Sequence, residues 1–298
     1  MLKVYLPEKM NRATMYNFIN EIIDDDRQPK ADSFEFMFNT LKFIEPVGVT
    51  VLSNITEWLI DKGIDLEYTY PKINYFEKIN SMCYLDDSLY FERYLNEKIR
   101  PNAEPRPTTI PLTLVTINES YQWFQKVIFW MSGKLGITTE SLADYKMCFQ
   151  EIFNNINDHS TEHIGCAFIQ HYPKENKICI AISDFGVGIP YNLQKLHPSL
   201  NDAQAIKEAV KQGISTKSTP RNRGAGLDTL IHNVVLNNMG SVYIHSNYGI
   251  LECKYKNEGI QMSSRLKRVF YPGTLIEINL RTDTIENILN DREDFAWD

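Results

Sequence analysis

Apolar and polar positions follow two periods along the first third of the chain, and both predict regular elements. Spacings of three and four predict helices, whereas the alternation from Phe34 to Phe38 predicts a half-buried strand. Strands are predicted at residues 3–6, 34–38 and 64–68, and helices at residues 15–23, 47–60 and 76–94. Because strands and helices alternate, this part is predicted to be a small α/β domain.

The remainder of the chain opens with two long helical patterns and then changes to strands. Helices are predicted at residues 120–135, 141–158, 203–212 and 227–238, and strands at residues 166–172, 177–183, 242–246, 250–255 and 275–280. These strands are expected to form a mostly antiparallel sheet. A run rich in Ser, Thr, Arg, Pro and Gly at residues 213–224 predicts a mobile loop.

Prolines mark the boundary between the two parts. Neither a helix nor a central strand persists through closely spaced prolines, so an extended linker is predicted there. The prolines are Pro101, Pro105, Pro107 and Pro111. The predicted organisation is a small α/β domain with a helical extension at residues 1–97, the linker at 98–111, a larger domain at 112–282 and an acidic tail at 283–298.

The composition narrows the class of protein. The 298 residues carry a formal net charge of −7, and this acidic balance disfavours bulk nucleic-acid binding. No apolar run is long enough to span a bilayer, and the N-terminus lacks the apolar core of a signal peptide, so we expect a cytoplasmic protein without a membrane partner. The five cysteines are scattered without a CxxC pair, which argues against disulfides and against a zinc cluster.

One face of a predicted helix carries polar residues that suit a catalytic cavity. Glu151, Asn155 and His159 are four residues apart, so they share this face. A carboxylate there can orient water, and an amide oxygen can bind Mg²⁺. A helix face that only meets solvent would give the same pattern.

A second segment joins a strand to two glycines. Asp184 ends the predicted strand, and Gly186 and Gly188 follow. Glycine lets the backbone approach a ligand closely, and an aspartate at a strand end can accept a hydrogen bond from an exocyclic amine. The alternative is a tight strand-to-helix turn with a capping aspartate. The segment is not a dinucleotide-binding fingerprint, because the third glycine and the βαβ context are missing.

A third segment is a basic loop that ends in Gly224-Ala225-Gly226 before a predicted helix. A helix start of this kind presents backbone N–H groups and a positive dipole end to phosphates. Lys217, Arg221 and Arg223 could add charge-assisted contacts. A solvated loop with a glycine-mediated helix start is the alternative.

Together with Gly273 and Thr274, the order and spacing of these segments resemble the sequence boxes of the GHKL ATPase superfamily. That superfamily includes histidine-kinase ATP-binding domains, anti-sigma-factor serine kinases, gyrase B subunits, MutL proteins and heat-shock chaperones. The resemblance covers residues 117–280. It implies an α/β fold of the Bergerat type, a sandwich in which helices cover one face of a mixed sheet, and it implies ATP and Mg²⁺ as ligands.

The resemblance implies a role for each matching position. Glu151 corresponds to a catalytic carboxylate, Asn155 to a ligand of Mg²⁺, and His159 to a basic residue near the phosphates. Asp184 corresponds to the aspartate that binds the adenine amino group, and Thr274 to a threonine that supports this site through water. The other matching positions line the nucleotide, cradle its phosphates or belong to an ATP lid at residues 213–223; they are Gly186, Gly188, Lys217, Arg221, Arg223, Gly224, Gly226 and Leu227.

Several functions stay open on these grounds. The chain is expected to be a regulatory switch of the histidine-kinase-like ATPase type, which hydrolyses ATP or transfers its γ-phosphate. The alternatives are an anti-sigma-like serine/threonine kinase, a non-hydrolysing ATP-gated interaction module, or a structural protein that has lost ATP binding. A conventional histidine kinase is disfavoured, because those usually carry Asn where Glu151 stands and no phosphoacceptor helix is evident. The expected partners are an unidentified protein and a second copy of the chain.

The first domain contains a second resemblance. Residues 41–52 are similar to the strand-loop-helix of STAS domains, the fold of anti-sigma-factor antagonists. Glu45, Pro46 and Val47 stand where that family has Asp-Ser-Ser, so the phosphorylated serine and its switch are not implied here. A generic α/β unit is the alternative. In either case the domain is expected to serve intramolecular contact, partner recognition or dimerisation.

Overall fold

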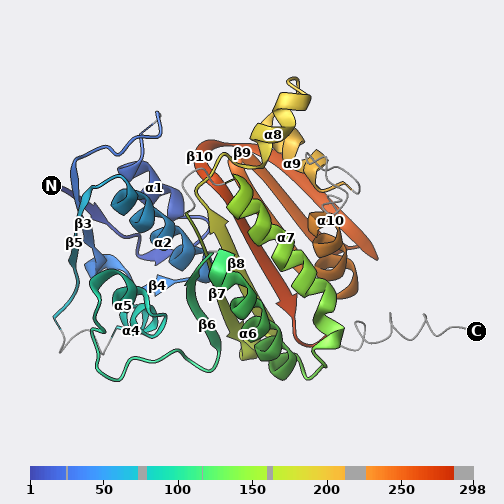
Figure 1. The fold of residues 1–298 in the computed structure, drawn as a ribbon, viewed down its shortest axis with the longest axis horizontal. Coiled ribbons are helices and arrows are strands. Elements are labelled where there is room, and N and C mark those ends of the chain that lie inside the picture. Colours follow the sequence, from blue (N-terminus) through green and yellow to red (C-terminus); the bar gives the residue numbers. More distant parts are fainter. Residues whose placement is uncertain (25, 73–78, 116, 160–163, 212–225, 285–298) are drawn as a thin grey trace, which may run out of the picture. The chain divides into compact units, whose positions relative to one another are not determined.

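The computed structural model describes the chain except residues 25, 73–78, 116, 160–163, 212–225 and 285–298 (Figure 1). It has a mixed α/β structure and divides into two compact units. Unit 1 comprises Met1–Thr113, Cys166–Gln170 and Ala181–Ser183, and unit 2 comprises Leu114–Gly165, His171–Ile180 and Asp184–Asp298. No described helix is long and apolar enough to cross a membrane.

Unit 1 contains a parallel sheet of three strands. Its order is β1 (Leu2–Tyr5), β3 (Ser33–Met37) and β5 (Asp65–Thr69), and the short strands β2 (Lys9–Met10) and β4 (Phe43–Ile44) pair separately in parallel. The alternation predicted a half-buried β3, but the strand is buried from Phe34 to Met37. This prediction was wrong because β3 is the central strand, and central parallel strands are buried on both faces.

Four helices belong to the described part of unit 1: α1 (Met15–Ile22), α2 (Pro46–Asp61), α4 (Asn80–Asp87) and α5 (Tyr90–Leu95). The first two match the predicted helices. The single helix expected at residues 76–94 is divided, because Leu89 adopts a left-handed conformation with φ 65° between α4 and α5. The beginning of that prediction, residues 76–78, lies outside the described residues.

Helix α2 is buried on nearly all sides within unit 1. Pro46 is its first residue, a position where the missing N–H of proline has no cost. Thr50 and Asn54 are fully buried. The carbonyl of Thr50 accepts the Cys166 thiol at 3.3 Å, and the Asn54 amide donates to Ser183 Oγ at 2.8 Å. Helix α2 is therefore a central helix of unit 1 and not an amphipathic surface helix.

Gly48 allows α2 to approach β2 closely. A Cβ on Gly48 would lie 2.5 Å from the Met10 carbonyl oxygen, whereas a Cβ on Gly133 of α6 (Ile117–Leu135) would have nothing within 4 Å. We expect Gly48→Ala to lower the free energy of unfolding by about 1–3 kcal/mol through overpacking. Gly133→Ala should raise it by up to about 1 kcal/mol, because alanine is the better helix former. Equal Tm values for the two variants in thermal denaturation would contradict this interpretation.

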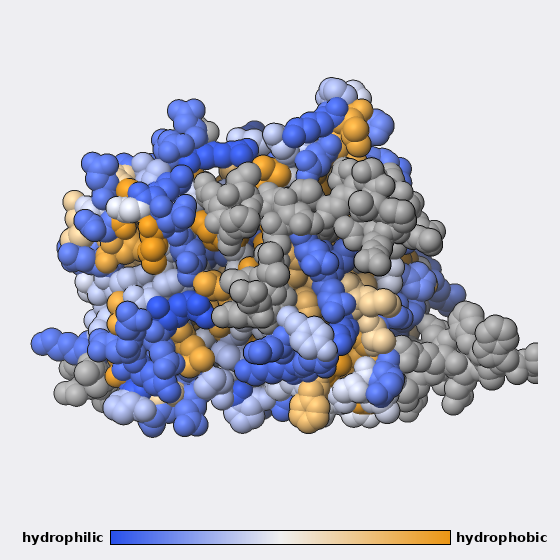
Figure 2. Space-filling model, viewed as in Figure 1, coloured by the Kyte–Doolittle hydropathy of each residue, from blue (hydrophilic) through white to orange (hydrophobic). Residues whose placement is uncertain are grey.

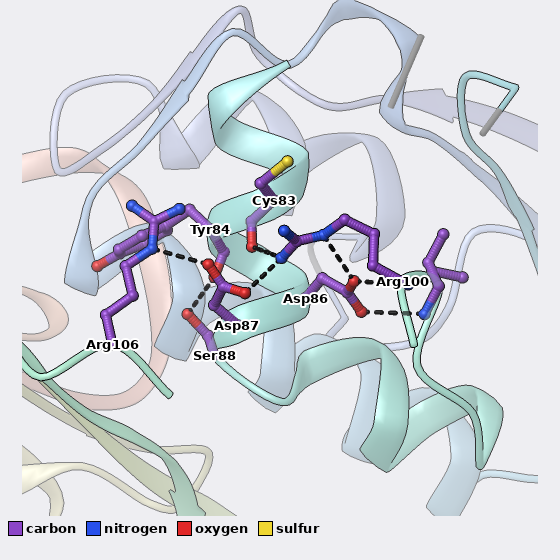
Figure 3. Close-up of polar contacts among 8 residues, drawn as sticks. Cys83, Tyr84, Asp86, Asp87, Ser88, Arg100 and Arg106 are labelled. Atoms are coloured by element: carbon purple, nitrogen blue, oxygen red, sulfur yellow. Dashed lines mark hydrogen bonds and ion pairs between the residues drawn. The ribbon is translucent and has the colours of Figure 1, made fainter. Parts of the chain in front are cut away.

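The stretch predicted as a linker begins with an ion-pair cluster against α4 (Figure 3). Asp86 is fully buried, and its carboxylate accepts the backbone N–H groups of Ile99 at 3.0 Å and of Arg100 at 2.9 Å. The Arg100 guanidinium bonds to both Asp86 and Asp87, and Arg106 Nε lies 2.8 Å from the Asp87 carboxylate. Residues 99–106 are therefore fastened to unit 1.

Strand β6 (Thr109–Leu114) follows this cluster and opens a sheet of five strands. The sheet order is β6, β7 (Gly165–Tyr172), β8 (Lys177–Asp184), β10 (Gly259–Arg281) and β9 (Ser241–Lys256). Pro111 lies inside β6, which is an edge strand, and edge strands tolerate proline. The predicted linker thus ends in a strand.

The hairpin of β9 and β10 is longer than its sequence pattern predicts. The two strands pair in antiparallel orientation from Lys256 and Gly259 down to Ser241 and Asn279, with register shifts near Tyr271. The turn places Asn257 and Glu258 at positive φ, as a tight hairpin requires. The three separate strands predicted at residues 242–246, 250–255 and 275–280 are parts of these two strands.

Helices α6, α7 (Ala143–His159) and α10 (Gly226–Ile231) lie in front of this sheet in Figure 1. The helix predicted at residues 227–238 is α10 followed by a π-helix, His232–Asn237. Helix α9 (Asp202–Ala209) begins with a capping box at Asn201, and α8 (Ile189–Leu196) was not predicted. In the view of Figure 2, hydrophobic residues on the surface form small groups between hydrophilic ones.

Candidate functional site

Asp184 ends β8 as a buried carboxyl group. Its side chain is only 8% exposed, and its carboxyl accepts hydrogen bonds from the backbone N–H groups of Gly186 and Thr274. Among the described residues, no Lys or Arg forms an ion pair with it. Burial raises its pKa from the ordinary value of 3.8 to about 7, and the two N–H groups oppose this rise. A buried acceptor of this kind is suited to a neutral donor.

Gly273 brings β10 into backbone contact with the segment after β8. Its φ is +116°, and a Cβ there would lie 2.3 Å from the Asp184 carbonyl oxygen and 2.6 Å from the Gly186 nitrogen. Only glycine fits this approach. Asp184, Gly186 and Thr274 are thereby held together.

Gly188 packs against β9 at the point where the register between β9 and β10 shifts. It has φ +80°, and a Cβ on it would lie 2.7 Å from Ser246 Oγ and 2.8 Å from Asn247 Oδ1. The Asn247 amide donates to the Val187 carbonyl at 3.3 Å. Ser246 and Asn247 were not predicted as site residues. The signal available in the sequence was the Ser-Asn pair at the end of an apolar strand, where Asn247 adopts φ 53°.

Glu151 and Gly226 form a second cluster. Glu151 is half-buried on α7, and Gly226 is the first residue of α10. A Cβ on Gly226 would lie 2.1 Å from Glu151 Oε2, so α10 passes directly over this carboxylate. The sequence placed these residues in separate segments, and the fold joins them. Leu227 follows on α10 and is half-buried.

The other predicted site residues cannot be compared with the structure. Asn155 and His159 lie on α7, but their side chains are outside the described residues. Lys217, Arg221, Arg223 and Gly224 lie outside the described residues altogether. Within the described part of the chain, no group of three or more His, Cys, Asp or Glu side chains is arranged to hold a metal ion. The assignment of Mg²⁺ to Asn155 therefore stays a prediction.

Comparisons with known proteins leave the family open. No protein-family profile matches the chain, and no curated protein matches it. One similar solved structure is the crystal structure of the N-terminal domain of a DNA repair protein, with 17% identity and a TM-score of 0.18. The match covers 39% of this chain and 31% of that one, so the chain spans about a third of that structure. So low a TM-score supports no conclusion about fold or function.

Proposed function

We propose that this protein binds ATP with Mg²⁺ and acts as a regulatory switch of the histidine-kinase-like ATPase type. In this proposal unit 2 is a Bergerat-type domain and unit 1 is STAS-like. The observation that supports it most is the arrangement of Asp184, Gly186, Gly273 and Thr274, which we call the Asp184 cluster. A buried carboxylate that pairs with no Lys or Arg of the described residues, closed in by Gly186, Gly188 and Gly273, suits the amino edge of adenine. The strand-loop-helix of β4, Glu45 and α2 supports the STAS-like assignment.

The Glu151 cluster supports chemistry at the γ-phosphate. Glu151 would accept the proton of the attacking hydroxyl as its oxygen bonds to phosphorus, and ADP would leave. Water as the nucleophile gives an ATPase, and a protein Ser or Thr hydroxyl gives a kinase. Bound Mg²⁺ would supply charge neutralisation, and Asn155 is the residue that we expect to hold it.

Calorimetric titration of the full chain with ATP, with and without MgCl₂, tests the binding site. Absence of binding would refute the proposal. Incubation with γ-labelled ATP then separates the alternatives, because an ATPase releases labelled phosphate, whereas a kinase labels protein. ATP binding without either product would favour the non-hydrolysing interaction module, whose partner would be an unidentified protein or a second copy.

We expect Glu151→Gln to reduce phosphate release by about 100-fold or more, because an amide cannot take up the proton. The dissociation constant for ATP should change by no more than about threefold, because the amide has the same shape and Glu151 is not assigned to binding. Asp144→Asn, in the first turn of the same helix, is the matched control. An unchanged turnover rate in Glu151→Gln would show that Glu151 is not the base.

A further inference from the structure

The hydroxyl of Ser246 has three hydrogen-bond neighbours behind the Asp184 cluster. Ser246 Oγ lies 2.9 Å from the backbone nitrogen of Ile189, 2.8 Å from the Gly273 carbonyl oxygen and 3.0 Å from Thr274 Oγ1. Ser246 is fully buried, and Thr274 is nearly so. Water therefore cannot exchange with these hydroxyl groups freely, and their protons are shared among the protein atoms present.

The direction of each hydrogen bond follows from the chemistry of the partners. A serine hydroxyl has one proton and two lone pairs. The Gly273 carbonyl can only accept, so it takes the Ser246 proton, and the Ile189 N–H can only donate, so it occupies one Ser246 lone pair. The remaining contact can form only if Thr274 donates its own proton to Ser246. Thr274 Oγ1 therefore has lone pairs but no proton for any other partner.

The donors and acceptors of the neighbouring Asp184 carboxyl group can be counted in the same way. When it is ionised, Asp184 is also an acceptor only, and the N–H groups of Gly186 and Thr274 occupy two of its lone-pair sites. Thr274 and Asp184 thus present acceptors alone to a ligand. We infer that Ser246 is a specificity-determining residue, which orients the Thr274 hydroxyl so that the site selects a 6-amino purine over a 6-oxo purine. This inference rests on the proposed function.

The inference is tested with ATP and ITP, which differ at position 6, an amino or an oxo group, and at N1, an acceptor in ATP and an N–H donor in ITP. At about pH 8, we expect the wild type to bind ATP about 100-fold more tightly than ITP. Ser246→Ala frees the Thr274 proton to serve an oxo group, directly or through a bridging water. The ratio of the two dissociation constants should fall by about tenfold or more. Ser263→Ala, on an exposed part of β10, should leave the ratio unchanged.

A purely structural role for Ser246 predicts a different result. Loss of its contacts to Ile189 and Gly273 alone would weaken the binding of ATP and of ITP by the same factor. An unchanged ratio of the two dissociation constants would therefore overturn the inference. Thr274→Val provides a second test should Ser246→Ala not fold. For the ligand this variant removes the acceptor that Thr274 presents, so ATP should bind about tenfold more weakly, whereas the 6-oxo group of ITP gains nothing from that acceptor and ITP should lose less affinity. Equal weakening of both ligands would again overturn the inference.

Different results would refute the proposed function and the role of Ser246. A wild type that binds neither ATP nor ITP refutes the proposed function, and the inference about Ser246 with it. A wild type that binds ATP, combined with an unchanged ratio in both variants, refutes the role of Ser246 alone.

Discussion

Asp184→Asn is expected to weaken ATP binding by about 100-fold or more and, at about pH 8, to make the ligand-free protein more stable. The loss of binding follows from the donor that the amide introduces. Its NH₂ group would face the adenine amino group or one of the N–H groups of Gly186 and Thr274, which now donate to the carboxyl. Calorimetric titration with Mg·ATP measures the change in affinity.

The gain in stability follows from the raised pKa of Asp184. A carboxyl whose pKa is raised by folding stabilises the fold below its unfolded pKa and loses that contribution as the pH rises through the folded pKa. For Asp184 this window runs from 3.8 to about 7, and the difference corresponds to a cost of roughly 4 kcal/mol above it. Asparagine avoids this cost but loses one acceptor, so we expect a net gain of about 1–2 kcal/mol at about pH 8.

Thermal denaturation at two pH values checks this prediction. A net gain of this size should raise Tm by about 3–6 °C at about pH 8. The gain should shrink as the pH falls below about 7 and be absent towards pH 4, where the carboxyl is protonated in both the folded and the unfolded chain. Glu277→Gln is the control. Like Asp184, Glu277 is a buried carboxyl group, but it lies on β10 and is not assigned to the ligand. A destabilised Asp184→Asn at about pH 8 would contradict the explanation, and retained ATP affinity would contradict the assignment to adenine.

Gly273→Ala is expected to be the most destabilising of the substitutions considered. Alanine would have to adopt φ +116°, and its Cβ would overlap the backbone at both Asp184 and Gly186. Neither backbone atom can rotate away as a side-chain end could. Strain and overpacking together should cost about 3 kcal/mol or more. ATP binding should also be lost, because β10 can no longer hold its position beside Asp184.

Gly136→Ala is the matched control for this substitution. Gly136 also has a positive φ, +69°, but a Cβ on it would have nothing within 4 Å. It should therefore show the conformational cost alone, about 1 kcal/mol. Denaturant unfolding of both variants measures the difference. Equal destabilisation would show that the backbone contact at Gly273 does not matter for stability.

The sequence predicted best those elements whose periodicity was long and uninterrupted. Helices α1, α2, α6 and α7 match their predicted ranges within a few residues. The long hairpin was divided into shorter strands because Tyr248 and Tyr271 lie near irregular positions, where the apolar alternation breaks. Helix α8 was not predicted because its eight residues, Ile189–Leu196, contain too few helical turns for a periodic pattern to be recognised.

The sequence indicated candidate site residues but not the residues that hold them in place. Asp184, Gly186 and Thr274 could be selected because their residue types and spacing are informative, and the fold brings them together. Ser246 and Asn247 could not, because their contacts with the segment after β8 depend on a register shift between β9 and β10. A single sequence contains no record of such a register shift.

The ion-pair cluster on α4 determines where the chain can be truncated or extended. A boundary placed before Ile99 would remove the donors that Ile99 and Arg100 give to the fully buried Asp86 carboxylate and leave a charge in the interior without compensation. Between Arg100 and Arg106 the backbone is largely exposed, and lengthening such a loop costs little closure entropy. Asn102 is thus a suitable place for an inserted tag or label, whereas a terminus belongs after Arg106.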